Sequence, residues 1–159
     1  MTALLLLQLA VAVPPPPLVD QFGREDSLES RRGTTVVALV VTAKRLRSIR
    51  GWELELHERL PDVSFLRVVD VPEQPKVTRE RVAAKLRERV PQQVPIGIDL
   101  ARGWAAAYGL DTSEVNVLVF GPEGELAARF RGRKSKPLVE QVVAAVEKRQ
   151  PRSAAGEER

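Results

Sequence analysis

The chain has 159 residues, 43% of them hydrophobic and none of them cysteine. This length and composition predict one folded domain with a core of its own. The lack of cysteine excludes disulfide bonds and any thiol chemistry by the chain's own side chains. The formal net charge is +4, but the cations are interspersed with 21 carboxylates and only 4% of the residues are aromatic. This pattern argues against nucleic acid as a partner, because surfaces that bind nucleic acid combine stripes of basic residues with aromatic residues on which bases stack.

The amino-terminal residues 1–12 form a candidate signal peptide. An apolar run over 4–10 precedes the small residues Ala10 and Ala12, which predict cleavage after Ala12. The run is shorter than the ~20 residues of a spanning helix, so we expect no membrane span in the mature chain. Residues 13–17 are a proline-rich linker. We therefore expect an exported protein, periplasmic or secreted; because no basic residue precedes the apolar run, a cytoplasmic location is the alternative.

The first half of the domain alternates between strand and helix patterns. Residues 34–41 are almost continuously apolar and β-branched, which is typical of a central strand covered on both faces. Apolar residues then recur every three or four positions over 49–60 and predict a helix. A second strand is predicted over 63–69. A charged helix follows, with Thr78 as its amino-terminal cap.

The second half begins with a short strand over 95–98 and a helix that Asp99 would cap and Gly109 would end. Two strands, 115–120 and 126–131, flank the turn 121–124 and predict a β-hairpin. Ser135 can cap a last helix with Leu138, Val142, Ala145 and Val146 on its apolar face, and 150–159 is expected to be a disordered tail. This order predicts a largely parallel sheet closed by one antiparallel hairpin.

The span 18–149 resembles the thioredoxin-like superfamily, in particular its redoxin, peroxiredoxin and membrane-anchored thiol oxidoreductase branch. The resemblance rests on 18–23 with the following Ser27, Leu28 and Gly33, on 98–110, and on the hairpin segment 121–126. It implies an α/β three-layer thioredoxin-like fold with a mixed central sheet, flanking helices and a C-terminal β-hairpin plus helix.

Two departures from the family pattern decide what the resemblance implies for function. Redox-active members carry a cysteine where the central strand gives way to a helix, and here that place is 42–50, with no sulfur nucleophile. The family's cis-proline would fall near Glu114 and Val115, where no proline stands. We therefore expect a redox-inactive domain without catalytic residues, metal or cofactor. The alternative is a thiol-redox enzyme of the redoxin family that acts through an unrecognised cofactor or a partner's thiol.

Lys44, Arg45, Arg47 and Arg50 crowd the start of the helix that follows the central strand. Cations are disfavoured there by the helix dipole, and free N–H groups at such a place bind anions. These four residues are the candidate anion- or partner-binding site, for a small anionic ligand or an envelope protein. The simpler alternative is that they extend into water and pair with Glu53 or Glu55.

Other polar residues favour structural roles. His57 is the only histidine and is expected to face solvent from its helix. Asp70 and Asp99 end predicted strands, where α/β folds often place ligand-binding groups, but capping is the simpler interpretation for Asp99. Cations near the last strand, among them Arg129 and Arg131, are expected to protect a sheet edge from aggregation.

Overall fold

A computed structural model describes residues 14–72, 74–91 and 93–150. Its strands are β1 (Leu18–Asp20), β2 (Glu25–Asp26), β3 (Val36–Thr42), β4 (Ser64–Asp70), β5 (Gly97–Asp99), β6 (Asn116–Phe120) and β7 (Leu126–Arg131). Its helices are α1 (Arg47–Arg59), α2 (Arg79–Arg89), α3 (Gly103–Tyr108) and α4 (Lys136–Glu147), with short 3-10 turns η1 (Glu29–Arg31) and η2 (Ala43–Arg45). From β3 onward the order of strands and helices is the predicted one. The predicted segment 1–12 and all of the predicted tail 150–159 except Gln150 lie outside the described residues.

The seven strands form one mixed sheet in the order β2-β1-β5-β4-β3-β6-β7. Parallel pairing joins β3 to β4 and β4 to β5, whereas every other neighbouring pair is antiparallel. The prediction of a largely parallel sheet was therefore wrong, because β6 enters antiparallel to β3 and the amino-terminal hairpin adds two further antiparallel pairings. The mixed sheet that the family resemblance implies is confirmed.

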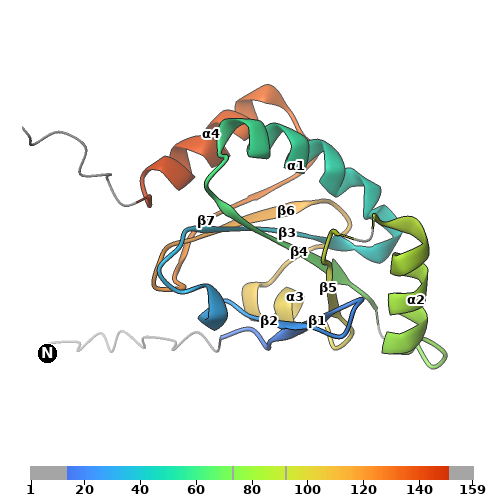
Figure 1. Cartoon of the computed structure of the whole chain (residues 1–159). Coiled ribbons are helices and arrows are strands. Elements are labelled where there is room, and N and C mark those ends of the chain that lie inside the picture. Colours follow the sequence, from blue (N-terminus) through green and yellow to red (C-terminus); the bar gives the residue numbers. More distant parts are fainter. Residues whose placement is uncertain (1–13, 73, 92, 151–159) are drawn as a thin grey trace, which may run out of the picture.

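Helices cover both faces of this sheet, which gives three layers (Figure 1). The helices α1 and α4 lie side by side over one face, and α3 lies on the other. The long strand β3 is central, and its residues from Val36 to Val41 are all buried. Because its side chains alternate between the faces, Val37, Leu39 and Val41 pack under α1 and α4, while their neighbours in the strand pack toward α3.

The two tryptophans anchor helices on opposite faces of the sheet. Trp52 on α1 and Trp104 on α3 are each 1% exposed. Each indole N–H also has an acceptor, because Trp52 Nε1 donates to the Gly132 carbonyl at 3.3 Å and Trp104 Nε1 donates to the Pro16 carbonyl at 3.1 Å. Satisfied indoles at these places fix α1 and α3 on the sheet.

Helix starts and faces differ from the sequence prediction in two places. The helix expected directly after Asp99 begins at Gly103, since Asp99 is the last residue of β5 and Arg102 occupies the cap position in a left-handed conformation. In α4 the buried residues are Val139, Val142, Val143 and Val146, while Leu138 and Ala145 are only partly buried. The helix is therefore rotated slightly from the predicted apolar stripe. Thr78 does cap α2, accepting the Arg81 N–H at 3.3 Å.

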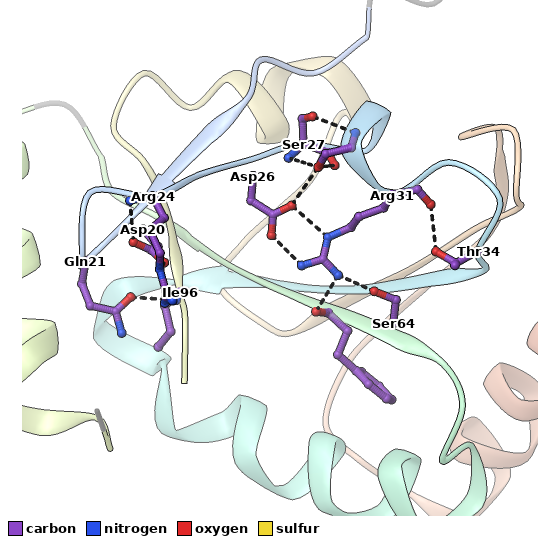
Figure 2. Close-up of polar contacts among 11 residues, drawn as sticks. Asp20, Gln21, Arg24, Asp26, Ser27, Arg31, Thr34, Ser64 and Ile96 are labelled. Carbon is purple, nitrogen blue, oxygen red and sulfur yellow. Dashed lines mark hydrogen bonds and ion pairs between the residues drawn. The ribbon is translucent and has the colours of Figure 1, made fainter. Parts of the chain in front are cut away.

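The amino-terminal hairpin is tied to the sheet by polar side chains (Figure 2). Gln21 accepts the Ile96 N–H at 2.8 Å and donates to the Val94 carbonyl at 2.7 Å, which holds the chain just before β5. Arg31 bridges Asp26 to Ser64 and to the Phe65 carbonyl at the start of β4. Hydrogen bonds between residues far apart in the sequence thus hold the amino-terminal hairpin and the turn after it on the rest of the sheet.

Candidate functional site

The strand-to-helix junction after β3 carries the four candidate cations. Thr42 ends β3, the turn η2 follows, and α1 begins at Arg47 without a side-chain cap or an acidic residue in its first turn. The side chains of Lys44, Arg45, Arg47 and Arg50 are all exposed. We call these four residues the basic junction.

The carboxylates that were expected to neutralise the basic junction have other partners. Glu53 pairs with Arg67, which extends from β4 beneath α1, and its Oε1 lies 3.5 Å from His57 Nε2. Glu55 pairs with Lys134 at 2.6 Å. In the described part of the chain, no residue of the basic junction has an ion-pair partner. The four side chains do extend into water, as the simpler alternative has it, but the pairing with Glu53 or Glu55 in that alternative is not found.

The loop that precedes β6 lies directly beside the junction. The Thr42 N–H donates to the Thr112 carbonyl at 2.9 Å, so the end of β3 is hydrogen-bonded to the loop just before Glu114 and Val115, where the resemblance would place the family's proline. None of the peptide bonds among the described residues is cis. The two segments at which the resemblance expected a cysteine and a proline thus meet in space, and neither carries that residue.

The carboxyl ends of three neighbouring strands bring Thr42, Asp70 and Asp99 side by side. Thr42 is in register with Asp70, and Asp70 with Asp99. Asp99 accepts the backbone N–H groups of Gly103 and Trp104, at 2.8 and 2.9 Å, and so caps α3 from three residues away. The structural role predicted for Asp99 is confirmed, although through the loop and not at the cap position itself.

Asp70 is completely buried, and its carboxylate is held by two residues that the sequence did not single out. Thr112 Oγ1 donates to Oδ2 at 2.6 Å, and Arg102 Nε donates to Oδ1 at 3.3 Å. Arg102 Nη2 lies 3.2 Å from Oδ2. No sequence pattern points to Arg102 or Thr112, because both are ordinary polar residues of loops that only the fold brings to Asp70.

Gly103 makes room for the proline-rich amino-terminal segment. A Cβ at Gly103 would lie 2.5 Å from Pro16 Cγ, nearer than van der Waals contact allows. Together with the hydrogen bond from Trp104 to the Pro16 carbonyl, this close approach places the segment against the start of α3. The segment expected to be a linker thus contacts the element that carries Arg102.

The other polar groups considered are occupied by structural contacts. A hollow between the β1–β2 turn and α2 contains Arg79 and Arg87, which donate to the carbonyls of Val19 and Gln21.

His57 is half exposed, and its ring packs on Phe65 with 4.2 Å between ring centroids. On β7, which is an edge strand as predicted, Arg129 donates to the Tyr108 carbonyl and Arg131 pairs with Asp111.

Comparisons with known proteins agree with this architecture. No protein-family model matches the sequence, and the search of curated proteins found no match. Among solved structures, the exposed lipoprotein thioredoxin of Streptococcus pneumoniae superposes with a TM-score of 0.65 at 17% identity, covering 82% of this chain and 98% of that one. Peroxiredoxin Q of Xanthomonas campestris gives a TM-score of 0.58 at 15% identity, covering 86% and 96%.

A third similar structure is the MTB protein dsbF, with a TM-score of 0.59 at 14% identity over 84% of this chain and 94% of that one. Identities this low establish the fold and leave activity open. In the described part of the chain, no helix has the length and apolar character needed to cross a bilayer. The chain therefore has the thioredoxin-like fold, built from a sequence that contains no cysteine.

Proposed function

We propose that this protein is a redox-inactive thioredoxin-like domain that binds an acidic partner through the basic junction. The observation that carries the proposal is the exposure of four cations at one strand-to-helix junction with no ion-pair partner among the described residues. Such a group of charges raises the local potential and attracts anions. The start of α1 has no side-chain cap, although the Leu46 and Ile49 N–H groups already donate to backbone carbonyls, so attraction rests on the cations.

Binding of a hexaglutamate peptide, measured by fluorescence anisotropy at low salt, tests the proposal. The test variant changes all four junction cations to glutamine. A matched control changes four other exposed cations, Lys76, Lys85, Arg89 and Lys148, so that the net charge falls by the same amount. We expect the junction variant to lose most of its affinity and the control to keep it, with wild-type binding weakening as salt rises. Equal affinities for the two variants would show that binding depends on the net charge alone, and this would contradict the proposal.

Redox inactivity is tested separately. The purified protein is expected neither to reduce insulin disulfides nor to consume peroxide, because both reactions need a thiolate and the chain has no cysteine. Turnover above that of a heat-denatured control would instead support the alternative of an enzyme with an unrecognised cofactor. Repeating the assay with added free thiol examines whether a partner's thiol could complete such an enzyme.

We also propose that the domain works in the cell envelope. Support comes from the candidate signal sequence 1–12 and from the similarity of fold to an exposed lipoprotein thioredoxin. Expression in a Gram-negative host followed by amino-terminal sequencing tests this. Cleavage after Ala12 would leave Val13 as the first residue. An intact Met1 on protein that stays in the cytosol would favour the cytoplasmic alternative.

A further inference from the structure

Arg102 lies at the same end of the sheet as the basic junction, and a buried carboxylate holds its side chain. Its guanidinium binds the buried carboxylate of Asp70 through Nε and Nη2. Asp70 is in register with Thr42, only two residues before Lys44. Thr112, which fixes the other side of the Asp70 carboxylate, also accepts the Thr42 N–H through its carbonyl. One hydrogen-bonded unit therefore links Arg102 to the strand end from which the basic junction begins.

The anchored guanidinium keeps donors to spare. An arginine has five N–H donors in a planar fork, and Asp70 takes the edge formed by Nε and one N–H of Nη2. The opposite edge consists of Nη1 and the second N–H of Nη2. Among the described residues Nη1 has no acceptor, and the side chain is 49% exposed. That edge is shaped to receive a second carboxylate or phosphate with two parallel hydrogen bonds.

The backbone of Arg102 is in a conformation that arginine rarely adopts. Its φ of 52° and ψ of 30° are left-handed, and it is the one non-glycine residue with positive φ in the described ranges. Glycine would take this conformation with little steric cost. An arginine held in it by a buried carboxylate is an outlier of the kind that clusters at functional sites.

We propose that Arg102, positioned by Asp70 and Thr112, binds one carboxylate of an acidic protein segment that the basic junction attracts. This inference rests on the proposed function and adds the residue that gives the site its geometry. A protein segment fits better than a small anion, because the cations are spread over the turn η2, the first turn of α1 and the loop before α3. Long exposed side chains supply attraction, whereas the fixed fork supplies specificity for a planar oxyanion.

Binding of hexaglutamate to Arg102→Lys, which keeps the charge and loses the fork, tests the inference. The control is Arg24→Lys, since Arg24 is also an exposed arginine whose Nε donates to a buried aspartate, Asp20, at 2.8 Å. We expect Arg102→Lys to bind about tenfold more weakly than wild type, as for a lost charge-assisted hydrogen bond, and Arg24→Lys to bind as wild type. Circular dichroism confirms that each variant is folded at the assay temperature.

Thr112 supplies a second measurement of positioning. Thr112→Val removes the hydroxyl that holds Asp70, and we expect weaker binding, whereas Thr112→Ser keeps the hydroxyl and should restore it. If Thr112→Ser binds as poorly as Thr112→Val, the positioning role is wrong. Both replacements are close in size to threonine, so we expect little change in packing. The stability of each variant is measured as well: weaker binding without a loss of stability indicates a mispositioned Arg102, whereas a loss of both indicates a loosened loop.

The outcomes distinguish this inference from the proposed function. If the junction variant loses binding while Arg102→Lys stays within twofold of wild type, the role of Arg102 is wrong and the proposed function stands. If neither variant changes the affinity, both are wrong. Inorganic phosphate and succinate are titrated in parallel. If either binds as tightly as hexaglutamate, the choice of a protein segment is overturned in favour of a small anion.

Discussion

Arg31 and Arg102 are both paired with an aspartate, but they use their donors differently. Arg31 binds both carboxylate oxygens of Asp26, at 2.9 and 2.5 Å, and turns its remaining nitrogen to Ser64 and to the Phe65 carbonyl (Figure 2). Its side chain is only 20% exposed. Among the described residues, the Arg102 guanidinium binds Asp70 alone, and the side chain is 49% exposed. Every guanidinium nitrogen of the first arginine has an acceptor within the protein, whereas Nη1 of the second has none among the described residues.

This difference separates a structural role from a binding role. Arg31 supplies a donor for the Phe65 carbonyl at the start of β4, which lies before the residues of that strand that pair with β5. Arg102 satisfies a buried carboxylate and still presents an edge to solvent. Changes around Arg31 should therefore reduce stability and leave hexaglutamate affinity unchanged. Changes around Arg102 should reduce affinity beyond what any loss of stability explains.

The largest effect is expected for Trp104→Ala, which removes the anchor of the helix next to Arg102. Truncation of a buried aromatic costs about 3–5 kcal/mol, and Trp104 is 1% exposed. Trp52→Ala, on the other face of the sheet, should cost a similar amount. Urea denaturation followed by circular dichroism measures both, with Leu54→Ala at an exposed position as control. A loss below about 1 kcal/mol at either tryptophan would contradict the described core.

Arg31→Lys should cost about 1.5–3 kcal/mol, because lysine cannot reach Asp26, Ser64 and the Phe65 carbonyl at once and leaves polar groups unpaired. The same variant should bind hexaglutamate as the wild type does. Arg32→Lys, at a more exposed neighbour that pairs with Glu29, is the matched control and should change stability little. If Arg31→Lys also binds hexaglutamate more weakly than wild type, the assignment of a structural role to Arg31 and a binding role to Arg102 is wrong.

Acid should remove the contribution of the Arg31–Asp26 pair to stability. Hydrogen bonds from Arg31 hold the pKa of Asp26 below its ordinary value. A depressed pKa adds stability above the pKa of the unfolded chain, about 4, and this stability is lost as pH falls through the folded value. The difference in melting temperature between wild type and Asp26→Asn should therefore shrink below about pH 4. A difference that stays constant from pH 6 to pH 2 would contradict this.

The smallest effect is expected for the basic junction itself. Cations near a helix start are disfavoured by a few tenths of a kcal/mol each, so changing all four to glutamine should stabilise the ligand-free protein by up to about 1 kcal/mol. The Lys76, Lys85, Arg89 and Lys148 control should show no comparable gain. Thermal melts at low salt measure the difference, which added salt should reduce. A destabilised junction variant would show that these cations support the fold.

Local patterns were enough to predict most of the architecture. The continuous apolar run of β3, the three- and four-residue spacing of α1 and the turn between β6 and β7 all follow from short-range preferences of the chain. The family resemblance supplied the mixed sheet, which the order of elements alone did not. The absence of thiol chemistry needed only the composition.

The sequence by itself determined the elements from β3 onward, many of the core residues, the lack of cysteine and the place of the basic junction. The tertiary structure alone decided which charges are neutralised. Arg102 and Thr112 lie 32 and 42 residues from Asp70 in the chain, and Glu55 meets Lys134 across 79 residues. Such pairs depend on strand register and on the left-handed turn at Arg102, which bring distant side chains within hydrogen-bond reach and leave no periodic signal in the sequence.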